Sequence, residues 1–294
     1  SAGQRLPFRG EQHLVEALSA SSFDDVDVAF FSAGGGTSRE FAPKAVAAGA
    51  VVIDNSSAFR MQADVPLVVP EVNRAAIAGH QGIIANPNCS TAQMVVALKP
   101  LHDRAKIKRV VVSTYQSVSG AGKGGIDELW DQTKSIYNPT DDKPARQFTK
   151  QIAFNVIPHI DKFQDNGYTK EEMKVTWECR KIMSQPNLAV SCTAVRIPTL
   201  RAHAESITIE TEKPIDMAVA MKALDDSPGV TVADSPKDNL YPMPITATKL
   251  YDVEVGRVRK NDVFGENGLD LFVCGDQLLR GAALNAVLIA EAVM

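Results

Sequence analysis

The chain has 294 residues, of which 45% are hydrophobic and 22% are charged, a composition typical of a globular protein with room for two domains. Its formal net charge of -4 leaves no basic field, which argues against nucleic acid or an anionic membrane surface as a partner. Four dispersed cysteines indicate neither a disulfide framework nor a metal site, and no apolar run approaches the ~18 residues of a membrane span. We therefore expect a cytoplasmic protein without a metal.

The first part of the chain predicts a strand, a glycine-rich turn and a helix. Residues 1–10 read as a polar loop, and residues 26–33 form an apolar run of the length of a central parallel strand. The run leads directly into Gly34-Gly35-Gly36, after which Thr37 or Ser38 can cap a helix over residues 39–48. Such a turn admits a phosphate or a ribose closely, although its glycine spacing is not the dinucleotide fingerprint.

Further strands follow at regular intervals. Residues 51–54 predict a short strand, residues 55–60 a loop that carries Arg60, and residues 82–85 another buried strand. Alternating strands and helices predict a doubly wound parallel sheet, whose ligand crevice lies at the carboxyl ends of its strands. At that edge, Arg60 is placed for contact with an anion.

The stretch Asn86-Pro87-Asn88-Cys89-Ser90-Thr91 follows the strand at residues 82–85 and precedes a helical pattern over residues 92–101, which Pro100 is expected to end. Cys89 therefore lies where a strand turns into a helix. The free N–H groups and the helix dipole there favour a thiolate and predict a pKa below the usual value of about 8.5. We expect Cys89 to be a nucleophile, and Cys179, Cys192 and Cys274 to be buried hydrophobic residues.

The remainder of the chain predicts a second, α+β domain. Residues 108–118 form a long β-branched run, and residues 188–197 and 205–211 alternate as antiparallel strands with one wet face do. Between them, residues 139–151 are polar and read as an exposed excursion. Residues 278–294 predict a buried helix rich in alanine and leucine.

Four motifs together resemble the aspartate-β-semialdehyde dehydrogenase family in order and spacing: Asn86–Thr91 (NPNCST), Tyr115–Gly122 (YQSVSGAG), Glu178–Lys181 (ECRK) and Arg196–His203 (RIPTLRAH). The resemblance implies an α/β fold, with a Rossmann-like doubly wound parallel sheet and an α+β catalytic and dimerisation domain. The implied domains are residues 1–88 with 276–294, which bind NADP, and residues 89–275, which hold the catalytic and dimerisation functions.

The resemblance also implies roles for individual residues. Cys89 would attack the aldehyde and form a thioester that phosphate releases, His203 would be the acid/base, and Gln116 would position the substrate. Arg196 would bind the substrate carboxylate, Glu178 would face its amino group, and Lys181, Arg60 and Asn88 would hold phosphate. The residues implied for the cofactor are Ser1, Ser32, Gly34, Gly35, Ser57, Ser119, Gly120 and Gln277.

One departure from the family pattern concerns the first strand and its glycine-rich turn, which the family places before the position of Ser1. From this we expect an unpaired strand edge with bare apolar surface, and weak binding of NADP by residues 1–294 alone. The expected partners are aspartate semialdehyde or aspartyl phosphate, inorganic phosphate, and a second copy of the chain in a homodimer or a dimer of dimers.

Three alternatives stay open at this point. N-acetyl-γ-glutamyl-phosphate reductase shares the Cys and His chemistry, but its substrate has an acylated amino group, which would not call for Glu178. A cysteine hydrolase would use His203 to activate Cys89 without NADP or phosphate. A truncated protein could also serve only as a non-catalytic oligomerisation partner.

Overall fold

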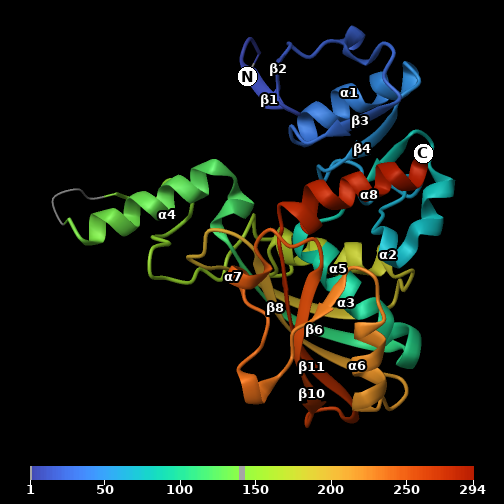
Figure 1. Cartoon of the computed structure of the whole chain (residues 1–294), viewed down its shortest axis with the longest axis vertical. Helices are drawn as coiled ribbons and strands as arrows, with labels where there is room; N and C mark the ends of the chain where they lie inside the picture. Colours follow the sequence, from blue (N-terminus) through green and yellow to red (C-terminus); the bar gives the residue numbers. More distant parts are fainter. Residues whose placement is uncertain (1, 139–142) are drawn as a thin grey trace.

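The computed structural model describes residues 2–138 and 143–294. It has an N-terminal lobe built on a small parallel sheet and a larger lobe built on a six-stranded sheet, with helix α8 lying between them (Figure 1). None of the helices in these residues is both long and apolar enough to cross a membrane.

The strands have the following bounds: β1 Arg5–Phe8, β2 Glu11–Leu14, β3 Val28–Phe31, β4 Val51–Asp54, β5 Ile83–Ala85, β6 Ile107–Gln116, β7 Ala189–Arg196, β8 His203–Thr211, β9 Val230–Val232, β10 Val253–Asn261 and β11 Gly265–Gly275. The α-helices are α1 Gly35–Ala47, α2 Pro70–Asn73, α3 Cys89–Ala105, α4 Lys123–Ile136, α5 Lys170–Ile182, α6 Met217–Asp225, α7 Pro244–Ala247 and α8 Leu284–Val293. Short 3-10 segments are η1 Ala20–Phe23, η2 Arg74–Gly79, η3 Val118–Ala121 and η4 Pro236–Asp238, and the π-helical segment η5 is Leu279–Ala283.

The N-terminal sheet has the order β3-β4-β5, and all its strands are parallel, as expected for a doubly wound fold. Helix α8 packs on this sheet, where Ile289 and Ala290 bury Ile53 and Ile84. The sequence predicts a central position for β3, but in the described residues β3 pairs only with β4 and forms the edge of the sheet. Phe30 on β3 is 55% exposed, so the expected bare apolar edge is present.

Two local predictions in this lobe are wrong. Residues 5–14 form an antiparallel hairpin of β1 and β2 and not a polar loop, because backbone pairing at Arg5 to Phe8 needs no buried side chain. Helix α1 starts at Gly35 with Gly34 as its N-cap residue, so neither Thr37 nor Ser38 caps it. The Ser38 hydroxyl instead donates to the buried Asp54 carboxylate, at 2.7 Å.

Helix α3 is the central element of the fold and begins at Cys89. Pro100 lies inside it and does not end it, since the helix continues to Ala105. Proline removes one backbone hydrogen bond from a helix. Here Leu101 and Ala105, on the turns that follow, are buried in the core, and this packing keeps the helix continuous.

The main sheet has the strand order β7-β6-β8-β11-β10-β9. Strand β8 pairs antiparallel to β6 and to β11, as the sequence predicts. Strand β7 was expected to be antiparallel as well, but it runs parallel to β6 at the edge of the sheet. The alternating burial of β7 does not depend on the direction of the strand. Helix α5 covers one face of β7, so its side chains are buried and exposed in turn.

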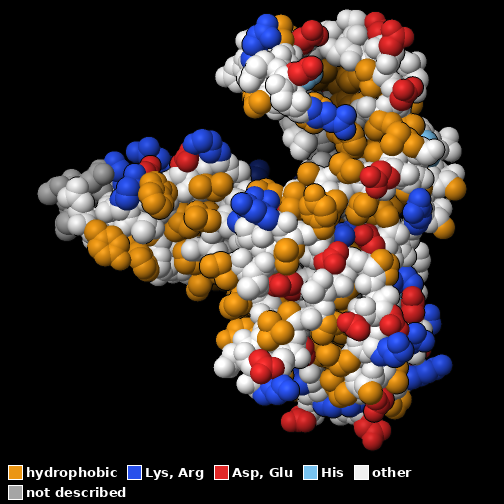
Figure 2. Space-filling model, in the orientation of Figure 1, with side chains coloured by type: hydrophobic (Ala, Val, Ile, Leu, Met, Phe, Trp, Pro, Cys, Tyr) orange, Lys and Arg blue, Asp and Glu red, His pale blue; other side chains and the backbone are white. Residues whose placement is uncertain are grey.

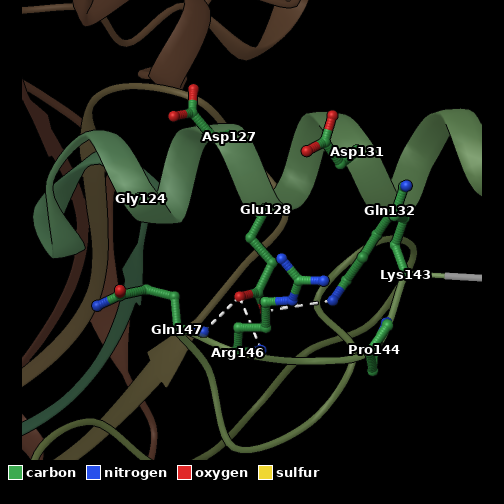
Figure 3. A pocket seen from close by; sticks show the side chains of 9 residues that line it. All are labelled: Gly124, Asp127, Glu128, Asp131, Gln132, Lys143, Pro144, Arg146 and Gln147. Atoms are coloured by element: carbon green, nitrogen blue, oxygen red, sulfur yellow. Dashed lines mark hydrogen bonds between the residues drawn. The ribbon is translucent and has the colours of Figure 1, made fainter.

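Helix α4 projects from the body of the molecule (Figure 1). The buried Glu128 accepts backbone N–H groups of Arg146 and Phe148, at 2.9 and 3.4 Å, and also that of Gln147, so the segment after residue 142 lies along the helix (Figure 3). Residues 143–151 contain no helix or strand and are mostly exposed, as predicted, whereas residues 139–142 of the expected excursion lie outside the described residues.

Candidate active site

A cavity of about 490 Å³ opens beside the N-terminus of α3. It lies between the two lobes, where β4 and β6 end and η5 begins. Nine of the residues predicted for the site line it: Ser57, Arg60, Asn88, Cys89, Gln116, Ser119, Gly120, Arg196 and Gln277. The described residues thus converge on one cavity from both predicted domains.

Cys89 is the first residue of α3. Asn88 is the N-cap residue, and its side-chain oxygen accepts the N–H groups of Ser90 and Thr91, at 3.0 and 3.3 Å. Gly281 of η5 closes one side of the cysteine, because a Cβ at Gly281 would lie only 2.6 Å from the Cβ of Cys89. A π-helical turn often marks a functional site, and here it brings a backbone without a side chain against the thiol.

The predicted low pKa of Cys89 is wrong for this structure. Burial, helped by the negative charge of Glu171, raises the pKa of the thiol to about 12. Arg196, Arg60 and a backbone hydrogen bond at Ser90 lower it by less. The helix terminus is present as expected, but the loss of hydration in the cavity outweighs it. The resting cysteine is therefore a thiol, and the two arginines are the groups that favour its ionisation.

Access, and not a low pKa, should make Cys89 the fastest of the four cysteines to react. Cys89 is partly exposed, whereas Cys179, Cys192 and Cys274 are buried. With iodoacetamide, we expect labelling at Cys89 first, with a rate that rises by about tenfold per pH unit between pH 7 and pH 9 because only the thiolate reacts. Peptide mapping measures this. A rate that levels off near pH 7 would show a low pKa, and faster labelling at a buried cysteine would contradict the exposure.

His203 is fully buried, and its ring is held by the turn after β6. Its Nδ1 accepts the backbone N–H of Ser117 at 3.0 Å and lies 3.1 Å from the Ser117 hydroxyl. Because Nδ1 accepts, the proton is assigned to Nε2, which has no partner among the described residues. Burial, together with the positive charge of Arg196, lowers the pKa of His203 to about 3, so the ring is neutral at pH 7. Its Nε2–H is a free donor.

Gly120 separates His203 from the cavity. A Cβ at this position would lie 3.1 Å from Nε2 of His203 and 3.0 Å from Nη1 of Arg196. The lack of a side chain at Gly120 keeps the space in front of both groups free of side-chain atoms; Arg196 lines the cavity, whereas Nε2 of His203 is buried behind Gly120. Arg196 is itself fixed by Ser117, whose carbonyl accepts its Nη1–H at 2.7 Å, and this bond uses one of the five N–H groups of the guanidinium.

The structure does not place Glu178 and Lys181 in the cavity. The carboxylate of Glu178 binds Arg60 at 3.0 Å and the backbone N–H of Asn88 at 2.6 Å, and the residue is 1% exposed. The Lys181 ammonium donates to the carbonyls of Arg60, Gln62 and Val65, at 2.6 to 2.8 Å. Both residues hold the loop that carries Arg60, so they act on its position and do not face a ligand.

A second Glu-x-x-Lys pair, two helical turns earlier, faces the cavity instead. Glu171 accepts hydrogen bonds from Asn88, Gln116 and Lys174, at 2.8, 3.2 and 3.0 Å, and Lys174 also binds Asp161 at 2.8 Å. Burial alone would raise the pKa of Glu171, but Lys174 and the hydrogen bonds from Asn88 and Gln116 bring it below its usual value, so Glu171 is ionised. The sequence interpretation missed this pair.

A signal for it exists in the sequence. Thr169 and Glu172 form a capping box at the start of α5, which places Glu171 in the first turn, next to the strand ends where Cys89 and Gln116 lie. Glu178 and Lys181 repeat the same spacing seven residues later and therefore share the same face of α5.

The comparisons with known proteins agree with this geometry. Residues 1–80 match a family model described as the NAD binding domain of semialdehyde dehydrogenase, and residues 98–280 match one described as its dimerisation domain. The chain is 55% identical to aspartate-semialdehyde dehydrogenase of Aquifex aeolicus and 51% identical to that of Bacillus subtilis, covering 99% of this chain and 86% of each relative. It superposes with a TM-score of 0.93 on aspartate semialdehyde dehydrogenase II of Vibrio cholerae complexed with ASA, at 46% identity, over 100% of this chain and 87% of that one.

The chain belongs to the aspartate-semialdehyde dehydrogenase family. The predicted family, fold class and enzyme class are thereby confirmed, and the three alternatives are not favoured.

This aspartate-semialdehyde dehydrogenase fold has a second, largely apolar cavity of about 460 Å³. It shares Asn55, Leu278 and Ala282 with the Cys89 cavity, and Ser32 lies on its wall. On the wall of the Cys89 cavity, Gln277 donates to the Ser119 hydroxyl and accepts the N–H of Ala202 at 2.8 Å. An apolar space continuous with the thiol suits a nicotinamide ring, as expected of an NAD binding domain.

The remaining predicted cofactor residues lie apart from these cavities. Gly34 and Gly35 form the start of α1 and do not line either of them, although a Cβ at Gly34 would meet nothing within 4 Å. This open helix N-terminus leaves room for a ribose or a phosphate. Ser1 lies outside the described residues.

Proposed function

We propose that the chain catalyses the reversible, NADP-dependent and phosphate-dependent oxidation of L-aspartate 4-semialdehyde to L-4-aspartyl phosphate, through a thioester at Cys89. The observation that carries this proposal is the set of charges around the thiol. Two acids, the buried Glu171 and the partly exposed Asp161, and three cations, Arg60, Lys174 and Arg196, line one cavity with Cys89. This set complements a zwitterionic amino acid aldehyde and a phosphate group.

The roles follow from the geometry of each side chain. Arg196 would hold the substrate α-carboxylate, because four of its N–H groups are not used by Ser117. Glu171, assigned in place of Glu178, would face the amino group. Lys174, in place of Lys181, and the free N–H groups of Arg60 would hold phosphate, with Asn88 alongside.

The covalent steps use Cys89 and His203. The Cys89 thiol gives its proton to solvent in the cavity, an ionisation that Arg196 and Arg60 favour, and Sγ then bonds to the aldehyde carbon while the carbonyl electron pair moves to oxygen. Nε2–H of His203, at the start of β8, then donates a hydrogen bond to the carbonyl oxygen as this oxygen gains negative charge. Gln116, at the end of β6, holds the substrate. When bound, the nicotinamide supplies the acceptor for hydride. A phosphate oxygen held by Lys174 and Arg60 attacks the resulting thioester, and the C–S bond breaks to restore Cys89.

Ser119, Gly120 and Gln277 would contact the nicotinamide end of NADP, because they line the Cys89 cavity where it meets the apolar cavity. Ser32 and Ser57 would lie along the same edge, and Gly34 and Gly35 would approach the ribose or phosphate at the start of α1. NADP, and not NAD, is part of this proposal.

We further propose that the chain forms a homodimer, or a dimer of two such dimers, and that it acts in the cytoplasm. The projecting helix α4 belongs to the segment that matches a dimerisation domain. It carries exposed apolar side chains at its free end, including Trp130 and Tyr137, which are 60% and 79% exposed. Figure 2 shows hydrophobic side chains gathered along this arm. Such side chains are typical of a surface that a partner covers.

The assay that tests the function supplies NADP and L-aspartate 4-semialdehyde with and without inorganic phosphate, and follows NADPH. We expect NADPH formation only when phosphate is present. The semialdehyde of N-acetylglutamate serves as the comparison substrate, and faster turnover of that compound would favour the sibling reductase. Hydrolysis of L-4-aspartyl phosphate to aspartate without NADPH would identify a hydrolase.

Replacing Arg196 with lysine keeps the charge but removes the planar fork. We expect Arg196→Lys to lower kcat/KM for the semialdehyde by about 2 kcal/mol, close to thirtyfold, because bidentate contact with the carboxylate is lost. Steady-state kinetics at saturating phosphate measure the effect. Near-native kcat/KM would move the carboxylate site to another residue.

A further inference from the structure

Glu205 on β8 is a buried acid that the steps above do not use. It is 0% exposed, and neither of its carboxyl oxygens has a hydrogen-bond partner among the described residues. It lies two residues after His203, so both side chains are on the same face of the strand, beneath α3. An ionised carboxylate in such a place, with no donor, would cost several kcal/mol.

Apart from the side chain of Gln93, no neighbour among the described residues provides a donor to an ionised Glu205. Thr114 is directly opposite on β6, but its hydroxyl donates to Oε1 of Gln116 at 3.0 Å. The other titratable groups near Glu205 are three thiols. Cys179 on α5 and Cys192 on β7 share its face of the sheet, whereas Cys274 on β11 pairs with Ala204 and lies on the opposite face. Burial raises the pKa of all three, so they are neutral.

Gln93 has a buried acceptor, Oε1, to which no group among the described residues donates a hydrogen bond. This residue follows Cys89 by one helical turn on α3 and is 1% exposed. Its Nε2 donates to the carbonyl oxygen of His203 at 3.4 Å, which leaves Oε1 as the free end of the amide, and Oε1 has no partner among the described residues. A neutral carboxylic acid can donate to such an oxygen, whereas a carboxylate cannot.

We propose that Glu205 is a positioning residue held as a neutral carboxylic acid, whose hydroxyl donates to Oε1 of Gln93. This bond fixes the amide of Gln93, whose other end holds the backbone of His203. The side chain of Gln93 thereby ties the helix that begins at Cys89 to the strand that carries the imidazole, and keeps the free Nε2–H of His203 at a constant position relative to the thiol.

The electrostatic environment supports this protonation state. Burial raises the pKa of Glu205 well above its usual value, and the nearby side chain of Gln93 opposes this shift only in part. The protonated form satisfies two orphaned oxygens at once, that of Gln93 and the hydroxyl oxygen of the acid itself.

The first experiment measures stability against pH for the wild-type protein and Glu205→Gln. In unfolded chains, glutamate ionises near pH 4.3, while folded Glu205 keeps its proton, so the wild type loses stability as the pH rises and the variant does not. From pH 5 to pH 7, we expect the ratio of their unfolding equilibrium constants to change by about tenfold per pH unit in favour of Glu205→Gln. Glu266→Gln, an exposed site on β11, is the control and should show no such slope. A flat ratio for Glu205→Gln would overturn the proposal.

The second experiment measures turnover, and it rests on the proposed role of His203. Glutamine at position 205 can still donate to Gln93, so Glu205→Gln should retain kcat/KM within about threefold, whereas Glu205→Leu and Gln93→Leu should each lower it by about tenfold. The double variant with both leucines should be no worse than either single one. Equal losses in Glu205→Gln and Glu205→Leu would show that the ionised carboxylate is needed and would overturn the proposal. The change of stability with pH does not depend on catalysis, so it can be measured even if the proposed function proves wrong.

Discussion

Cys89→Ser should lower kcat for phosphate-dependent NADPH formation by about 10⁴-fold, because a serine hydroxyl ionises far less readily than a thiol and its ester does not react with phosphate as a thioester does. The burial that raises the pKa of Cys89 would weigh still more heavily on an alkoxide. Folding should be unaffected, since the two side chains have nearly the same shape. Stopped-flow and steady-state assays with NADP present measure the loss.

Cys192→Ala is the matched control, because Cys192 is buried on the edge strand β7 and does not line the cavity. It should retain most of the wild-type kcat. A Cys89→Ser protein with more than a hundredth of wild-type activity would move the nucleophile to another residue.

Glu171→Gln should lower kcat/KM for L-aspartate 4-semialdehyde by about 2 to 3 kcal/mol, or 30- to 150-fold, because a charge-assisted contact with the substrate amino group becomes a neutral one. The loss should be smaller for an analogue that lacks the amino group. The same substitution removes the negative charge of Glu171 beside Lys174. The Lys174 ammonium still binds Asp161 at 2.8 Å, so it should stay in place.

Glu178→Gln distinguishes this assignment from the one that the sequence motif suggested. Its carboxylate is bound by Arg60 and by the N–H of Asn88, and breaking a buried pair of this kind costs about 3 to 5 kcal/mol of stability. We expect a lower Tm and a higher KM for phosphate, through the displaced Arg60, with a smaller change in KM for the semialdehyde. If Glu178→Gln alone raises the semialdehyde KM, the amino group is bound by Glu178 and not by Glu171.

The position of Cys89 could be predicted from the sequence because a strand, a turn and a helix start are local features, and Asn88 was already present to cap the helix. The pKa of Cys89 could not be predicted from the sequence. It depends on burial by segments far along the chain, including Gly281, and on the charge of Glu171, none of which shows in the residues near the cysteine.

The two Glu-x-x-Lys pairs show a second limit. Both have helical spacing on one face of α5, and spacing alone does not say which turn of the helix reaches the cavity. The loop that carries Arg60 decides it, because it takes up Glu178 and Lys181, and this contact is a property of the tertiary packing. Similarly, the parallel direction of β7 depends on the crossover through α5, while its alternating burial is common to both directions.

The contact of Gly281 with Cys89 has a consequence for the order in which the protein is made. During translation, Cys89 is added long before the η5 segment. Until then, neither Gly281 nor Gln277 covers the thiol, and α8 is not there to bury Ile53 and Ile84 of the N-terminal sheet. The N-terminal lobe therefore completes its packing only after η5 and α8 have been synthesised. During synthesis Cys89 is a more open cysteine than in the folded protein, and it is sheltered only when η5 packs against it.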